Sequence, residues 1–228
     1  MGTVQSFMNN MNWIQLVILV MGAAASLVCL TIHELSHGLV AYRLGDPTAK
    51  INGRLTLNPI AHVDPVGLCL MLLARVGWAK PVPVDMRNFK NPKRDMAFTA
   101  LAGPVSNIVL AFIALAICSG VYYFAPDHPI CAYIMLFFTY MAVLSVGLCL
   151  FNLIPIPPLD GSKVLFSLLP SRIYNTILRY ERYLVAAVVL LAWTGVFSGP
   201  LWLFVEGIIR MLCKLTAFPF EIPQYYFF

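Results

Sequence analysis

The sequence contains little charge. Only 11% of its 228 residues are Asp, Glu, Lys or Arg, whereas 60% are hydrophobic and the mean hydropathy is +0.81. A soluble domain has about 25% charged residues, because polar groups must cover much of its surface. The composition therefore excludes an ordinary soluble domain and predicts an integral membrane protein. The net charge of +5 is then expected to reflect basic cytoplasmic loops, and no nucleic-acid partner is expected.

Paired cysteines are also missing. No two of the six cysteines stand in a CxxC spacing, and all lie within or beside apolar stretches; they are Cys29, Cys69, Cys118, Cys131, Cys149 and Cys213. This pattern is typical of small buried side chains rather than of a disulfide framework or a zinc knuckle. No basic region precedes the first apolar run, so a cleavable signal peptide is not expected.

Long apolar runs are what the sequence has in abundance. A membrane-spanning helix needs about 20 residues, and the runs that reach or approach this length are 13–32, 97–125, 129–159 and 183–205. We expect an all-α polytopic membrane protein with a three-helix catalytic core, formed by helices over 13–44, 95–124 and 130–155. Gly199-Pro200 divides the last run, which predicts a C-terminal helical hairpin over 182–197 and 200–214. The expected domains are a core over 1–170 and a C-terminal transmembrane hairpin and tail over 171–228.

The segment between the first two core helices, residues 47–84, is expected to be extended or re-entrant. Its apolar run, residues 63–74, is too short to cross a bilayer. Thr48–Leu57 alternates partly and contains the Asn52-Gly53 turn signal, and Pro81–Val84 also has an extended pattern. We therefore expect a small β-sheet at the cytoplasmic membrane face.

Loop charges predict the orientation. If 63–74 does not cross the membrane, the basic segments 43–62, 75–95 and 160–182 all lie on one side. Basic loops favour the cytoplasmic side. The N-terminus is then outside, the C-terminus returns inside, and the protein is expected in the plasma membrane.

Ionisable residues at membrane depth are costly and therefore indicate function. The first helix runs directly into His33-Glu34-Leu35-Ser36-His37. In a helix His33 and His37 are one turn apart on the same face, so both imidazoles can reach one metal ion. Glu34 is adjacent, placed to take a proton from a water molecule on that metal. The motif predicts a metal site at the inner end of the first helix.

A catalytic zinc site needs a third protein ligand and an open position. The charge pattern places Asp127 on the outer side, and Asp85 lies in a charged, solvated loop. Asp160 ends the third long run on the inner side, after three prolines that cannot continue a helix. Asp160 is therefore favoured, while His62 and Asp64 stay open, and a helix-capping role for Asp160 is the alternative.

Four motifs together resemble the site-2 protease family of intramembrane zinc metalloproteases. They are HELSH (33–37), LNPIAHVDP (57–65), AGPVSN (102–107) and FNLIPIPPLDG (151–161), and the likeness extends over about residues 13–170. The resemblance implies one Zn²⁺ held by His33, His37 and Asp160, with Glu34 as general base. It also implies an oxyanion contact at Asn152 and active-site support from Asn58 and His62. The substrates it implies are transmembrane segments of other membrane proteins, and the chain resembles a minimal form without a PDZ or CBS domain.

Two other functions compete with this interpretation. CAAX-processing and heat-shock membrane metalloproteases use a glutamate as third ligand, for which this chain offers only Glu181 and Glu206, neither in a supporting motif. A metal-ion or proton transporter would use the same His and Asp residues along a path. A path needs ionisable residues at several depths, and here they gather at the inner side.

Overall fold

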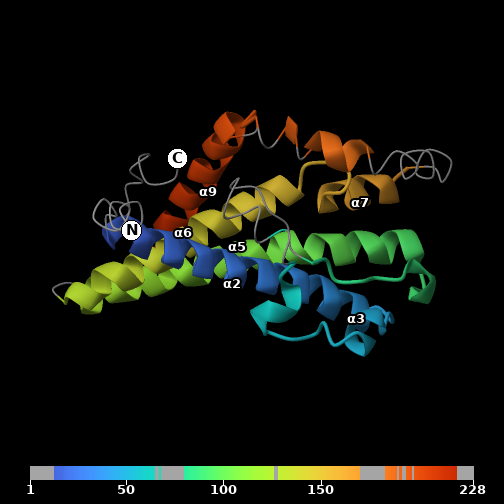
Figure 1. Cartoon of the computed structure of the whole chain (residues 1–228), viewed down its shortest axis with the longest axis horizontal. Helices are drawn as coiled ribbons and strands as arrows, with labels where there is room; N and C mark the ends of the chain where they lie inside the picture. The colour runs from blue at the N-terminus through green and yellow to red at the C-terminus, as the bar shows by residue number, and fades with distance from the viewer. Residues whose placement is uncertain are drawn as a thin grey trace, which may run out of the picture.

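The computed structural model describes residues 13–64, 67, 80–125, 128–169, 183–188, 190–191, 194–196 and 198–219. Within these ranges the protein is helical and contains no strand. Three helices there are long and apolar enough to cross a membrane: α2 (Trp13–Arg43), α5 (Pro92–Phe124) and α6 (Pro129–Asn152). They run side by side along the long axis of the molecule (Figure 1). The prediction of three long apolar core helices is confirmed.

Small buried side chains allow these helices to pack closely. The core includes Ala25 of α2, Ala111 and Ala114 of α5, and Ala142 of α6, all with 1% exposure or less. In lipid there is little hydrophobic drive between helices, so close backbone approach and van der Waals contact hold them together. Many large apolar side chains of α2 and α5, such as Leu19 and Phe112, are instead exposed, as lipid-facing groups are.

Helix α2 ends in a glycine cap directly after its basic last turn. Gly45 has φ +109°, Gly45 N–H donates to Tyr42 O at 3.2 Å, and Asp46 N–H donates to Ala41 O at 2.9 Å. This pair of bonds is the Schellman pattern, which satisfies the last carbonyls of a helix. The cap fixes where the chain leaves α2, ten residues after the first histidine of the motif.

The predicted β-sheet is wrong where the structure describes it. Thr48–Ile51 forms the one-turn helix α3, whose first N–H is accepted by Asp46 Oδ1 at 3.0 Å. Gly53 has φ +66° and ends α3 through bonds from Gly53 N–H to Lys50 O and from Arg54 N–H to Ala49 O. The Asn52-Gly53 pair that predicted a hairpin turn therefore ends a helix instead. Both a hairpin turn and a helix C-cap favour a glycine with positive φ. Residues 81–84 form neither a helix nor a strand.

The segment 80–84 is tied to the loop that follows α3 by buried polar groups. Lys80 N–H donates to His62 O at 2.9 Å, and Arg54 donates through Nη2 to the carbonyls of Lys80 and Pro81. Two short 3₁₀ helices flank this region, η1 (Pro59–His62) and η2 (Met86–Asn88). The predicted re-entrant run 63–74 lies, apart from residues 63–64 and 67, outside the described residues.

After α6 the chain unwinds at three prolines and then forms α7 (Asp160–Ser167), which packs against α5. Gly161 lies so close to the unwound segment that a Cβ there would be 2.2 Å from Leu153 O. Glycine at this position lets α7 begin beside the end of α6. The tight turn brings the first residue of α7, Asp160, into contact with the histidines of α2.

The C-terminal helix α9 (Ser198–Thr216) covers α6 and α5. A turn at residues 194–196 precedes it, as the predicted hairpin requires, and Pro200 is accommodated in the first turn of α9. However, Tyr123 Oη donates to Ala217 O at 3.0 Å, so α9 ends beside the end of α5 that is remote from the histidines. The expected return of α9 to the end of the fold that carries the histidines is therefore not found, because α9 ends beside Tyr123 at the opposite end of α5.

Candidate metal centre

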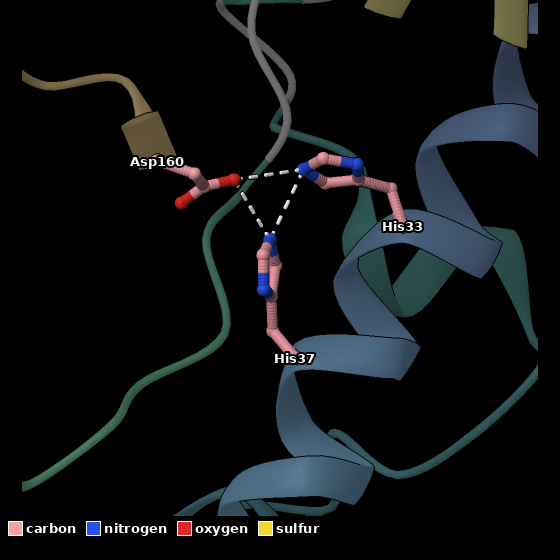
Figure 2. A group of neighbouring side chains, drawn as sticks. All are labelled: His33, His37 and Asp160. Carbon is pink, nitrogen blue, oxygen red and sulfur yellow. Dashed lines mark hydrogen bonds and ion pairs between the residues drawn. The ribbon is translucent and has the colours of Figure 1, made fainter. Parts of the chain in front are cut away.

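Two histidines of α2 and one aspartate of α7 converge on a common point (Figure 2). His33 Nε2 lies 3.1 Å and His37 Nε2 lies 3.0 Å from Asp160 Oδ2, and the two Nε2 atoms are 3.0 Å apart. All three residues are at most 8% exposed. The helical spacing of four residues, which predicted a shared face, thus brings two nitrogen donors and one carboxylate oxygen together.

The donor set fits zinc. A tetrahedral zinc site with bonds of about 2.0–2.1 Å has ligand atoms about 3.3 Å apart, close to the three distances found here. Helix α5 leaves room for the cluster at Gly103, where a Cβ would lie 2.4 Å from His37 Nε2 and 2.6 Å from His33 Cε1. Three protein ligands leave a fourth position for water or substrate, as catalytic rather than structural zinc sites do.

Each ligand side chain is held from behind by a second group. Thr99 O accepts the Nδ1–H of His37 at 2.7 Å, and the Asn107 amide lies 3.2 Å from His33 Nδ1. Lys163 Nζ donates to Asp160 Oδ1 at 2.9 Å, which leaves Oδ2 for the cluster. Such partners fix the orientation of metal ligands and tune their basicity.

In the metal-free protein burial raises the pKa of Asp160, but hydrogen bonds from His33 and from a charged His37, together with the charge of Lys163, lower it more. The net shift is downward, so Asp160 is held as the carboxylate. A carboxylate is the form in which aspartate binds a metal.

A cavity of about 300 Å³ opens at the cluster. Glu34 and Asn152 line it together with the three clustered residues, and the extended segment 81–84 forms part of its wall. Val82 N–H donates to Glu34 Oε2 at 2.8 Å, while Glu34 Oε1 has no hydrogen-bond partner among the described residues. Asn152 donates one N–H to Leu148 O at 2.9 Å, which leaves its second amide N–H for another acceptor.

The structure does not bring His62 or Asn58 to the cluster. His62 is buried, and its Nε2 donates to Thr56 O at 2.9 Å. Asn58 is exposed and caps η1, accepting the N–H of Ile60. Neither residue lines the cavity. Both residues therefore stabilise the loop that contacts the segment 80–84, and neither lies beside the ligands.

The remaining ligand candidates lie elsewhere. Asp85 pairs with Arg87 at the surface, and Asp64 accepts the N–H of Gly67. Glu206 forms a salt bridge with Arg210 on α9. Asp127 and Glu181 lie outside the described residues.

Several residues of the site were not singled out for it from the sequence: Arg54, Val82, Thr99, Asn107 and Lys163. Asn107 was quoted only as the last residue of the AGPVSN motif (102–107). A usable signal was present, because Asn107 is an amide in an otherwise apolar stretch, one helical turn after Gly103. Lys163 follows Asp160 by three residues, a spacing at which helical side chains meet.

Comparisons with known proteins agree with this geometry. The model of peptidase family M50 matches residues 127–194, a range that contains α6, the unwound prolines and Asp160. The “Putative zinc metalloprotease YwhC” of Bacillus subtilis (strain 168) is 42% identical over 86% of this chain and 90% of its own length. The “Putative zinc metalloprotease Rip2” of Mycobacterium tuberculosis (strain H37Rv) is 28% identical over 88% of this chain and 75% of its own length. No solved structure matches significantly. On these grounds the chain belongs to peptidase family M50, the site-2 protease family.

Proposed function

We propose that this protein is an intramembrane zinc metalloendopeptidase that hydrolyses peptide bonds within or near transmembrane segments of other membrane proteins. The observation that carries the proposal is the convergence of His33, His37 and Asp160 at the end of a membrane-length helix, with Glu34 in the same cavity. Membership of peptidase family M50 and likeness to a protein named as a zinc metalloprotease support the same chemistry.

Hydrolysis requires an activated water, a stabilised oxyanion and a proton for the leaving amine. Bound zinc lowers the pKa of its water to about 7 and polarises the substrate carbonyl. Glu34 accepts the proton of the attacking water at Oε1 and returns it to the amine as the C–N bond breaks. The contact from Val82 N–H keeps the other oxygen of Glu34 in place. The second N–H of Asn152 donates to the oxyanion.

The charge distribution supports an orientation with the active site toward the cytoplasm and the N-terminus outside, in the plasma membrane. Arg43, Lys50 and Arg54 lie at the cluster end of the fold, as do the basic residues that precede and begin α5. Residues 1–12 carry no charge, and the connection between α5 and α6 has Asp127 as its only charged residue. Basic loops favour the cytoplasmic side.

We assign the catalytic core to residues 1–170 and a C-terminal helical unit to residues 171–228. The core contains all the cavity-lining residues. In the C-terminal unit, α9 packs its buried Val205, Ile209 and Leu212 against the core. His62 and Asn58 act in this core as indirect supports, because His62 O holds Lys80 N–H next to the cavity wall.

Transport of metal ions or protons is not favoured. A permeation path needs ionisable groups at several depths. Along α2 the first charged residue or histidine is His33, α5 has none after Asp95, and α6 has none at all. These groups make one site at one depth.

Cleavage of a panel of single-span membrane proteins by the purified full chain in proteoliposomes tests the proposal. We expect cleavage sites within or beside the transmembrane segment, loss of activity with a chelator, and recovery with zinc. Glu34→Gln should lower the rate by about 10²–10⁴-fold, because the general base is removed. Glu206→Gln makes the same chemical change on α9 and should leave the rate unchanged. No cleavage of any substrate, or a Glu34→Gln rate equal to wild type, would contradict the proposal.

A further inference from the structure

The two metal-site imidazoles have chemically different partners at Nδ1. His37 Nδ1 lies 2.7 Å from the carbonyl oxygen of Thr99, and His33 Nδ1 lies 3.2 Å from Nδ2 of Asn107. A carbonyl oxygen only accepts, so His37 must hold its proton on Nδ1. The lone pair of His37 Nε2 is then directed at the cluster, as a metal ligand requires.

The amide of Asn107 can serve His33 in either of two ways. With Nδ2 toward the ring it donates to Nδ1, and the proton of neutral His33 is on Nε2, which then cannot bind a metal. With Oδ1 toward the ring it accepts the Nδ1–H, and the lone pair of Nε2 is free. The two ends of an amide have the same shape, and a half-turn about the last bond exchanges them.

Burial makes the choice consequential. Asn107 is 0% exposed, lies on α5 one helical turn after Gly103, and its Oδ1 has no hydrogen-bond partner among the described residues. Either orientation leaves one end of the amide without a described partner, but only one leaves His33 able to bind a metal. An amide acceptor at the back of a ligand imidazole is the arrangement that fixes its tautomer.

We propose that Asn107 is a positioning residue of the metal site: its Oδ1 accepts the Nδ1–H of His33 and thereby directs the His33 Nε2 lone pair toward zinc. This inference rests on the proposed function. It assigns to α5 a part in metal binding through both Thr99 O and Asn107, although α5 contributes no ligand. A plain interhelical hydrogen bond between α5 and α2 would instead stabilise the bundle without selecting a tautomer.

The tautomer-selecting role and the plain interhelical hydrogen bond differ in which substitution of Asn107 preserves metal binding. Asn107→Leu keeps the branched shape and the number of heavy atoms of the side chain and removes the acceptor, so metal affinity should fall by about 10–100-fold. Asn107→Asp keeps an acceptor oxygen at the same place. It should bind the metal at least as tightly as the wild type, because carboxylates commonly stand behind metal-binding histidines. Ser106→Ala is the matched control, since Ser106 Oγ bonds Gly103 O in the same turn and does not contact His33.

The readout is Co²⁺ affinity of the full chain in detergent, measured by chelator competition and by the visible absorption of tetrahedral cobalt, together with the melting temperature of the metal-free protein. We expect weak binding and an altered spectrum for Asn107→Leu, wild-type binding for Asn107→Asp, and no change for Ser106→Ala. If Asn107→Leu does not fold, Asn107→Ala has the same expected loss. Wild-type affinity in the acceptor-free variant, or an equal loss in Asn107→Asp, overturns the inference. A wild-type chain that binds no cobalt overturns the proposed function itself.

Discussion

Gly103 is the point at which α5 passes the metal cluster, and adding one methyl group there tests the geometry of the site. In Gly103→Ala the Cβ would lie 2.4 Å from His37 Nε2 and 2.6 Å from His33 Cε1. Ordinary van der Waals contact begins at 3.4 Å. The methyl group must therefore displace the ring of His37 by about 1 Å, or move α5 by the same amount.

The two costs of this displacement separate metal binding from stability. In the metal-free protein the imidazole can rotate away, so the free energy of unfolding should change by no more than about 1–2 kcal/mol. In the metal-bound protein, 1 Å is about a third of the ligand-to-ligand distance of a tetrahedral zinc site. We therefore expect zinc affinity to fall by about 100-fold, and cleavage to fall at least as far.

Chelator competition for zinc and the melting temperature of the metal-free protein measure these two effects. The matched control is Gly120→Ala on the same helix, because nothing lies within 4 Å of a Cβ at that position. It should leave zinc affinity unchanged and stabilise α5 by about 0.5–1 kcal/mol. The reasoning is refuted if Gly103→Ala binds zinc as tightly as Gly120→Ala. It is also refuted if the loss of zinc affinity in Gly103→Ala is no larger than the loss of stability of the metal-free protein accounts for.

Two further predictions concern the groups that place the cluster and its surroundings. Gly161→Ala should destabilise the fold by about 3 kcal/mol, because its Cβ would lie 2.2 Å from the backbone oxygen of Leu153, which no side-chain rotation relieves; an unchanged melting temperature would contradict this. Burial raises the pKa of Asp46, but hydrogen bonds from Thr48 and Asn88 lower it more, and the net shift is downward. The ionised carboxylate should therefore stabilise the fold at neutral pH, and that stability should fade as the pH drops below about 4 and through the lowered pKa. Asp46→Asn should flatten this acid limb in pH-dependent unfolding, and an acid limb as steep as that of wild type would show that Asp46 does not cause it.

Features that depend on neighbours in the sequence were predictable. The three membrane-length helices follow from apolar runs, and the shared face of His33 and His37 follows from the helical repeat. Asp160 required one more step, the argument that it ends a run at the depth of the histidines. That argument concerns depth only, and the contact with Nε2 of both histidines is a finding of the structure.

Features that depend on packing between helices were not predictable. The sequence marks Asn107 as an unusual amide but does not specify that it reaches His33 or that Gly103 faces the imidazoles, because both contacts depend on how α5 crosses α2. The sheet over 48–57 was wrong for a local reason, since Gly53 can end a helix as well as make a hairpin turn. The end of α9 was not predictable either. Loop charge indicates on which side of a membrane a loop lies, but it does not specify which end of α5 the last residues of α9 contact.

The central claim is that His33, His37 and Asp160 together hold the catalytic zinc. Elemental analysis of the purified full chain, alongside Asp160→Asn, tests it most directly. Asp85→Asn is the matched control, because it makes the same change at a carboxylate that pairs with Arg87 away from the cluster. We predict one zinc ion per chain in the wild type and the control, in keeping with the single cluster among the described residues, and loss of that zinc from Asp160→Asn after dialysis against a chelator that leaves the wild type loaded. Undiminished zinc in Asp160→Asn under the same dialysis would contradict the account.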